Sequence, residues 1–215
     1  MTDSRTKDLV LEYRLLPASD VLKAYNIEIA EYPESEAASL ENLVYRQTAA
    51  PQLFLGCYTP CSRTTKAEAA RETEEQRQGQ GQGQEHDYGS DVLVGYIVST
   101  LSSDKALTHA SMSSHDPKGS SVCIHSVCVA GAYQRKGIAR TMMKEYLKHL
   151  KNINASVTFS SVSSEETVTS GRLERVLLIA HKELIGLYAG AGFELVGQSG
   201  VEHGPDPWYE MVYRL

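Results

Sequence analysis

A histidine and a cysteine, His125 and Cys123, stand two residues apart in the apolar run SSVCIHSVCVA (120–130). Because histidine titrates near neutral pH, His125 is a candidate general base. Residues two apart on a strand share a face, so a Cys/His pair that forms an acyl-enzyme is a second mechanism to consider. The structural alternatives are a core histidine with satisfied hydrogen bonds and a buried, unreactive thiol.

A basic turn containing a glycine follows that run, with the sequence QRKGIA (134–139). The start of a helix presents unpaired backbone N–H groups and the positive end of the helix dipole. Gly137 lets a bulky anion approach the backbone, and Arg135, Lys136 and Arg140 add positive charge. These features favour a phosphate or diphosphate ligand. The turn matches neither the P-loop nor the dinucleotide-binding glycine pattern, and an ordinary strand–helix turn with solvated basic side chains remains the alternative.

The hydrophobic periodicity predicts the elements that position these residues. We expect helices at about 20–32, 39–49, 136–150 and 183–189, the first capped by Ser19 or Asp20 and ended by Pro33. The expected strands are at 9–15, 52–59, 92–101, 120–130, 175–180, 193–200 and 208–215. This order of elements predicts an α/β fold with a mixed sheet.

Two polar segments interrupt this plan. Residues 62–90 contain no Val, Ile, Leu, Met, Phe or Trp, so apolar burial cannot offset the entropy of ordering them. We expect a disordered insertion there and a polar loop at 154–172. The chain length suits one hydrophobic core, so residues 1–215 are predicted to form a single domain.

The composition excludes several classes of protein. A net charge of -6 opposes binding to nucleic acid, which requires a positive surface, and mildly favours cationic small molecules. The sequence contains neither the ~20 apolar residues that span a bilayer nor a secretory signal at its start. We therefore expect a cytoplasmic protein, monomeric or weakly dimeric, with no nucleic-acid or membrane partner. The spacing of the four cysteines does not match a zinc site, so we expect free thiols and no metal.

Residues 134–139 resemble the Q/R-x-x-G-x-G/A loop that binds the diphosphate of coenzyme A in the GNAT superfamily of N-acetyltransferases. Ala139 stands at the last position, where that pattern also accepts alanine. Residues 115–150 and 175–197 are similar to the arylalkylamine (serotonin) N-acetyltransferases and, more closely, to the fungal polyamine acetyltransferases. The resemblance implies an α/β GNAT fold, in which a mixed central sheet is flanked by helices and splayed at the acetyl-CoA site.

The resemblance implies that acetyl-CoA, without a metal, binds between the strand that ends at Val129 and the strand at 176–180. A bulge near the end of the first strand would open this gap. The pantetheine arm would pair with backbone groups there, and the diphosphate would bind the turn. The expected acetyl-CoA-binding residues are Val127, Cys128, Val129, Gln134, Arg135, Lys136, Gly137, Ile138, Ala139, Arg140 and Tyr188.

The resemblance also implies roles in the reaction. The family carries two histidines two residues apart on this strand; His125 matches the second, and Cys123 replaces the first. Tyr188 precedes Gly192 and Phe193 at the spacing of the family's tyrosine, which points its hydroxyl group at the coenzyme A sulfur. The expected catalytic residues are therefore His125 as base, Tyr188 as acid and Cys123 as a further candidate.

The expected acceptor site lies under an aromatic loop. Tyr32 and Pro33 fall where the family places a loop over the amine, and Ile179 would complete the wall. Other candidates each have an ordinary alternative. His181 and Trp208 either line the site or belong to the surface and the packing, and Glu28 and Glu31 either steer a cation or are exposed helix carboxylates.

These inferences predict an enzyme that transfers acetyl from acetyl-CoA to a small primary amine by direct attack in a ternary complex. Arylalkylamines such as serotonin and tryptamine, and polyamines, are the expected acceptors. A protein or peptide N-acetyltransferase is one alternative. A coenzyme A-binding sensor that has lost its catalytic base is the other.

Overall fold

The computed structural model describes residues 9–60, 91–160, 172–201 and 205–215. Seven strands form one sheet in the order β1-β2-β3-β4-β5-β7-β6, in which only the β4–β5 pair is parallel. The strands are β1 (Glu12–Leu15), β2 (Phe54–Thr59), β3 (Val92–Ser102), β4 (Ser121–Val129), β5 (Arg175–Ala180), β6 (Glu194–Gln198) and β7 (Tyr209–Arg214). The predicted α/β fold with a mixed sheet is confirmed.

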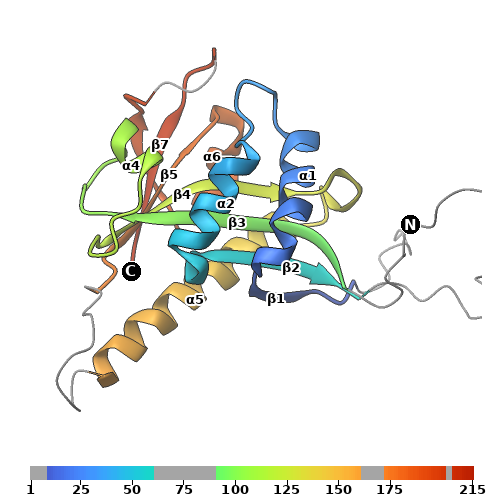
Figure 1. Cartoon of the computed structure of the whole chain (residues 1–215). Coiled ribbons are helices and arrows are strands. Elements are labelled where there is room, and N and C mark those ends of the chain that lie inside the picture. The colour runs from blue at the N-terminus through green and yellow to red at the C-terminus, as the bar shows by residue number, and fades with distance from the viewer. Residues whose placement is uncertain (1–8, 61–90, 161–171, 202–204) are drawn as a thin grey trace, which may run out of the picture.

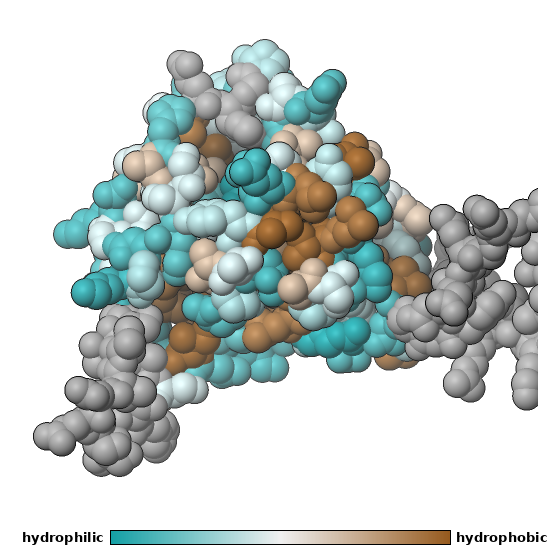
Figure 2. Space-filling view, in the orientation of Figure 1, coloured by the Kyte–Doolittle hydropathy of each residue, from teal (hydrophilic) through white to brown (hydrophobic). Residues whose placement is uncertain are grey.

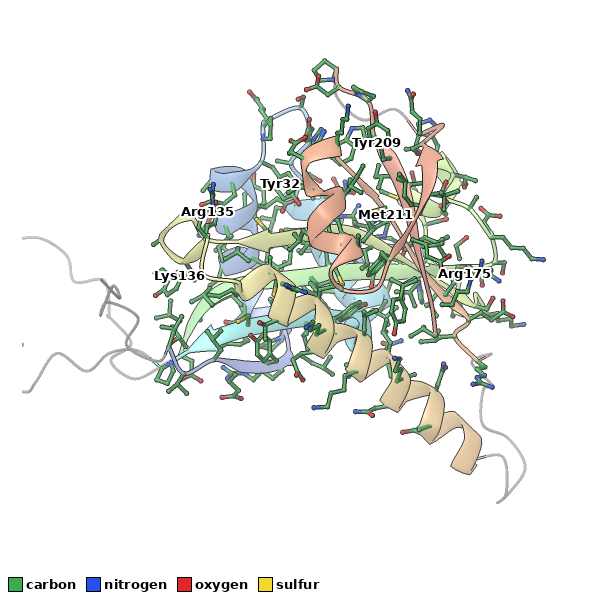
Figure 3. The ribbon with its side chains drawn as sticks, turned by 180° about the vertical axis from the view of Figure 1, so that it is seen from behind. Tyr32, Arg135, Lys136, Arg175, Tyr209 and Met211 are labelled. Carbon is green, nitrogen blue, oxygen red and sulfur yellow. The ribbon has the colours of Figure 1, made fainter. Side chains whose placement is uncertain are left out.

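Helices cover both faces of the sheet. The helices are α1 (Val21–Glu31), α2 (Leu40–Ala49), α4 (His109–Ser113), α5 (Ile138–Ser160) and α6 (Ile185–Ala189). Figure 1 shows α1 and α2 on the near face, and Figure 3 shows α5 and α6 on the opposite one. On α5 the predicted apolar stripe is buried, as Ile138, Met142, Tyr146 and Leu150 pack into the larger core. Burial of this stripe fixes α5 against the sheet.

The sheet splays between β4 and β5. Only Ser121–Cys123 of β4 pairs with β5, at Arg175–Leu177. Beyond that point both strands continue without pairing, and Figure 1 shows β5 and β7 turning away from β4. The predicted splay is therefore present, and it leaves one backbone edge of the second half of β4 uncovered.

A bulge lies in the middle of β4, whereas the sequence analysis expected it near the end of the strand. Val98 pairs with Ser126 and the next residue, Ser99, pairs with Ile124, so His125 is the extra residue. A bulge bends its strand and re-aims the side chain at that position. The same irregularity therefore opens the sheet and orients His125.

The helices differ from the prediction in three respects: the end of α5, the cap of α1 and the presence of α4. Helix α5 continues to Ser160, so the expected polar loop at 154–172 is wrong over 154–160. Asn154 explains the extension, because its side chain exchanges two hydrogen bonds of 2.8 Å with the backbone of Leu173. Asp20 precedes α1 but makes no side-chain cap, and α4 was not predicted. The rest of that loop, at 161–171, and the expected insertion at 62–90 lie outside the described residues.

Apolar side chains remain exposed on the outer face of α1 and α2. Figure 2 shows a hydrophobic patch over these helices, whose exposed apolar side chains include Leu22, Ile29, Leu40 and Val44. Within the described ranges, no helix is both long and apolar enough to cross a bilayer.

Candidate active site

Two cavities meet beside the splayed half of β4. The first, called the histidine cavity, has a volume of about 280 Å³ and is lined by residues that include His125, Glu36, Arg46, His181 and Trp208. The second, called the loop cavity, has a volume of about 500 Å³ and runs along β4 to the turn before α5. Four residues line both cavities: Tyr32, Val127, Leu184 and Tyr188. The shared wall is where a group bound in one cavity can reach a group bound in the other.

The uncovered edge of β4 offers the backbone of alternate residues to the loop cavity. Ala130 N donates to Val94 O, and antiparallel pairs alternate in hydrogen bonding. The backbone groups of Cys128 therefore face Tyr96 of β3, and those of Val127 and Val129 face the gap. The expected backbone pairing is wrong for Cys128, although Cys128 lines the cavity.

Two side chains already bind carbonyl groups on this edge. The hydroxyl group of Tyr32 donates to Val127 O over 3.2 Å, and the amide group of Gln134 donates to Val129 O over 2.9 Å. Each of these carbonyl oxygens keeps a second lone pair, so a ligand along this edge could still use both the carbonyl and the N–H groups.

The turn before α5 has the geometry of an anion site. Arg135 and Gly137 have φ angles of 62° and 79°, so the chain adopts a left-handed conformation twice. A Cβ at Gly137 would meet no described atom within 4 Å, so space does not require a glycine there. The positive φ does favour glycine, because a residue with a Cβ is strained in this conformation. Thr141 N donates to Gly137 O, one turn earlier. The amide groups before Thr141 at the start of α5 have no carbonyl group one turn earlier within the helix, as is usual at a helix start.

The basic side chains of the turn are not equivalent. Arg135 and Arg140 line the loop cavity, and Arg140 also donates to Gly190 O over 3.1 Å. Lys136 instead donates to Ala132 O over 2.9 Å and is absent from the described lining of the cavity. Figure 3 shows Arg135 and Lys136 on the loop between β4 and α5. The structure therefore does not bring the expected Lys136 side chain to the site.

Glu31, at the end of α1, holds this turn from the other side. Its carboxylate accepts hydrogen bonds from Gly131 N at 2.6 Å and from the amide of Gln134 at 2.7 Å. A Cβ at Gly131 would lie 2.9 Å from the Glu31 carboxylate, so a larger residue there would require this side chain to shift. The role of Glu31 in the structure is to fix the turn, not to form a freely exposed charge.

His125 lies in the wall of the histidine cavity. Its Nε2 is 2.8 Å from Thr100 Oγ1, and its buried Nδ1 has no hydrogen-bond partner among the described residues. Burial, with the nearby positive charge of Arg46, holds the pKa of His125 well below its usual range. The imidazole is therefore neutral at neutral pH, with one ring nitrogen unprotonated, and the lowered pKa also makes it a weaker base than a free imidazole.

Cys123 is not brought to the site. Its side chain is fully buried among Leu107, Leu177 and Val201, and it is missing from the described lining of both cavities. Burial raises the pKa of the Cys123 thiol to about 12. Because the thiolate is the reactive form, this environment favours a packing role over the acyl-enzyme mechanism.

Tyr188 and Tyr32 stand where the cavities meet. Tyr188 packs edge-on against Phe193, with ring centroids 6.0 Å apart. Burial raises the pKa of both hydroxyl groups above the ordinary tyrosine value. Both tyrosines are therefore neutral proton donors at physiological pH.

The far wall of the histidine cavity is an acid–imidazole–indole stack. Glu36 lies 3.0 Å from His181 Nε2, and the imidazole ring stacks on Trp208 with centroids 3.9 Å apart. Ile179 also lines this cavity, as expected. Pro33 does not occur in the described lining; its carbonyl accepts from the amides of Glu36 and Ala37, so it shapes the loop that carries Glu36.

Glu28 proves to be a buried anchor rather than an exposed carboxylate. It is 1% exposed and accepts hydrogen bonds from Ala38 N, Ser126 Oγ and the hydroxyl of Tyr96. These bonds tie α1 to β3 and β4. Glu28 is therefore neither of the two alternatives considered from the sequence, an exposed helix carboxylate or a group that steers a cation.

Sequence reasoning missed several residues of the histidine cavity, including Glu36, Arg46 and His109. Arg46 could have been found, because it follows the fully buried Leu43 by three residues on α2 and so shares its inward face. Glu36 and His109 carry no comparable signal, since one follows a turn and the other belongs to the unpredicted α4.

The described parts of the chain contain no group of three or more side chains that could hold a metal ion. The positive loop, the apolar channel and the free amide groups fit a long, anionic ligand such as acetyl-CoA.

Comparison with known proteins identifies one family model and several solved structures. The family model described as acetyltransferase (GNAT) family matches residues 48–169, more than half of the chain. No curated protein matches the chain.

Solved structures share the fold at low identity. The GNAT-like decarboxylase GphF in complex with isobutyryl-CoA is 12% identical, with a TM-score of 0.62 over 94% of this chain and 98% of its own. The Arabidopsis thaliana NAA60 in complex with acetyl-CoA is 18% identical, with a TM-score of 0.55 over 96% and 100%. A chain of the NatC complex bound to Gag peptide and CoA is 12% identical, with a TM-score of 0.59 over 95% and 98%.

Proposed function

The chain belongs to the acetyltransferase (GNAT) family and is an acetyl-CoA-dependent acetyltransferase; we propose that its acceptor is a small primary amine, acetylated by direct transfer within a ternary complex. The observation that carries this proposal is the meeting of two cavities at Tyr188, with a neutral histidine in one and an anion-binding turn in the other. Arylalkylamines and polyamines are the acceptor classes to compare.

The loop cavity is the proposed acetyl-CoA site. Amide groups at the start of α5, with Arg135 and Arg140, would bind the diphosphate. The N–H groups of Val127 and Val129 would hold the pantetheine arm like an added strand. Acetyl-CoA bound in this way would supply an acetyl group already activated as a thioester.

His125 is the proposed base. A primary ammonium group has a pKa of ~10 and must lose a proton before its nitrogen can react. With the proton on Nε2, the ring donates to Thr100 Oγ1, and Nδ1 keeps a free lone pair. Nδ1 is itself buried in this structure, so the proposed role requires that the acceptor or a water reach it from the cavity. A buried polar atom without a partner costs about 1–3 kcal/mol, which such a contact would offset.

Tyr188 is the proposed acid. Its raised pKa keeps the hydroxyl protonated, and its place in the shared wall allows it to donate to the departing sulfur. Tyr32 would sit beside the same point. The two proton transfers are then assigned to different side chains, so neither side chain has to regain its starting protonation state before the other transfer occurs.

The histidine cavity suits a small acceptor. Its volume of about 280 Å³ is near the lower end of small-molecule sites, which span roughly 300–1,000 Å³. The stacked rings of His181 and Trp208 can pack on an aryl group, and Glu36 lies against the same wall. These features favour an arylalkylamine over a long polyamine.

An acceptor screen at fixed acetyl-CoA tests the proposal. The purified chain is incubated with arylalkylamines, polyamines and short peptides, and release of free thiol is measured. We expect turnover of small amines to exceed that of the peptides. Preferential turnover of peptides would instead establish a peptide acetyltransferase. Acetyl-CoA binding without turnover of any acceptor would establish the sensor.

A further inference from the structure

Arg46 is a cation in the histidine cavity that the proposed reaction does not use. It projects from the inward face of α2, is partly buried and lines the cavity with His125. Burial lowers its pKa to about 10, so the guanidinium still carries its charge at neutral pH.

The guanidinium group has no hydrogen bond or ion pair with any residue that the structure describes. Glu28 attracts it electrostatically, but the carboxylate of Glu28 is engaged by Ala38, Ser126 and Tyr96. A guanidinium has five N–H donors in a planar fork that matches a carboxylate. A partly buried guanidinium that bonds to no described residue is available to an anionic group of a ligand in this cavity.

The opposite charge lines the same cavity. Glu36 lies beside His181 and Trp208 on the loop between α1 and α2, whereas Arg46 projects from α2 itself. A cavity with one acid and one cation complements a molecule that carries both an ammonium and an anion. A polyamine, which is positive along its length, would instead be repelled by Arg46.

We propose that Arg46 binds a carboxylate of the acceptor, so that the preferred substrates of this enzyme are amino acids, the carboxylated counterparts of simple amines. The inference rests on the proposed function, since it takes the histidine cavity as the acceptor site. Arg46 is a specificity residue in this reading: it binds the acceptor and takes no part in proton transfer.

The test compares matched acceptors that differ only at the carboxylate. Phenylalanine, phenylalaninamide and phenethylamine form one series, and ornithine with putrescine forms a second. In the wild type we expect kcat/KM for the carboxylated amine to exceed that of its uncharged or decarboxylated partner by about 10- to 100-fold, the range expected for a charge-assisted hydrogen bond.

Arg46→Met should abolish this preference. The ratio of kcat/KM between phenylalanine and phenethylamine should fall to about 1, as expected when the contribution of one charged contact is lost. Comparing ratios between variants cancels the different basicities of the amines. Lys148→Met is the matched control, because it removes one positive charge from an exposed site on α5; its ratio should equal that of the wild type.

A wild-type preference for decarboxylated amines, or a ratio unchanged in Arg46→Met, would overturn the proposal. If Arg46→Met does not fold, Arg46→Gln and ligand-induced shifts of the wild-type unfolding temperature replace it. Phenylalanine should then raise the temperature and phenethylamine should not; equal shifts overturn the inference. Because these shifts need no turnover, they separate a wrong acceptor class from a failure of the proposed acetyl transfer.

Discussion

The loop cavity and the histidine cavity meet at one wall but are built in different ways. Most of the loop cavity comes from a single stretch, residues 127–140, with additions from the end of α1 and from α6. The histidine cavity collects side chains from the loop between α1 and α2, from α2, α4, β4, β5 and α6, and from the segment between β6 and β7. A contiguous stretch can be recognised as a motif, whereas a wall assembled from many segments cannot.

The two cavities also differ in how they recognise a ligand. The loop cavity offers backbone amide groups, a helix start and two arginines, which suit an anion without reading its detailed shape. The histidine cavity offers individual side chains from different segments: the cation Arg46, the acid Glu36 and the imidazoles of His109, His125 and His181. The first arrangement fits a constant carrier, and the second fits a substrate that varies between enzymes of one fold.

Tyr188→Phe should have the largest effect, because Tyr188 serves both cavities. The substitution removes the hydroxyl and retains the ring that packs on Phe193. We expect kcat to fall by ~10³-fold, within the usual range for general acid–base catalysis. Steady-state kinetics at saturating concentrations of both substrates measures this, with the exposed Tyr45→Phe as control. A kcat within about twofold of the wild type would remove Tyr188 from the reaction.

His125→Gln tests the histidine cavity alone. Glutamine can keep a bond to Thr100 but cannot take a proton, so we expect kcat to fall by ~10²-fold. The KM for acetyl-CoA should stay unchanged, because His125 lines only the other cavity. An equal rise of both KM values, with kcat preserved, would show that His125 only supports the packing.

Gly137→Ala tests the loop cavity alone. A left-handed conformation at alanine costs roughly 1–2 kcal/mol, which corresponds to a rise of about 5- to 30-fold in the KM for acetyl-CoA if the turn changes shape. The KM for the amine should not change. Gly200→Ala, at an exposed glycine without a left-handed φ, is the matched control. Equal effects on both KM values would mean that the cavities are not independent.

The smallest effect concerns stability and pH. The pKa of His125 is lower in the folded chain than its unfolded value of ~6.5, so below that pH the unfolded state binds the additional proton. The wild type should therefore lose stability relative to His125→Gln as pH falls below 6.5, by at most about 1.4 kcal/mol per pH unit. Above that pH the difference between the variants should be constant.

Urea unfolding of both proteins at several pH values measures the free energy of unfolding. His115, whose pKa is also lowered by burial, is present in both variants and cancels in the comparison. Parallel pH profiles would show that the unpartnered Nδ1 of His125 is open to protonation in the folded state.

Much of the fold follows from local patterns. The apolar run 120–130, the basic turn and the stripe from Ile138 to Leu150 predict β4, the anion site and α5, because each depends on neighbours a few residues away. The bulge at His125 was misplaced because it depends on the pairing of β4 with β3. The length of α5 was underestimated because Asn154 finds its partner, Leu173, on a distant segment.

The candidate site shows the same difference between what depends on neighbours in the chain and what depends on folding. Residue type and spacing pointed to His125 and the turn around Gly137, and the resemblance to the GNAT family added Tyr188. Chain folding set the direction of each side chain: Lys136 turns to Ala132, Glu28 enters the core and Glu31 binds Gly131. These directions depend on which donors and acceptors are nearby.

Periodicity and motif spacing are properties of short stretches, so they survive in the linear chain and specify the strands, the helices and the diphosphate-type turn. The wall of the histidine cavity does not follow from periodicity or motif spacing. Trp208 is far in the chain from Glu36 and Arg46, and the three share a cavity because the sheet splays beyond Cys123 and leaves space between its halves. The burial of these side chains and the placing of their charges arise only in that packed arrangement.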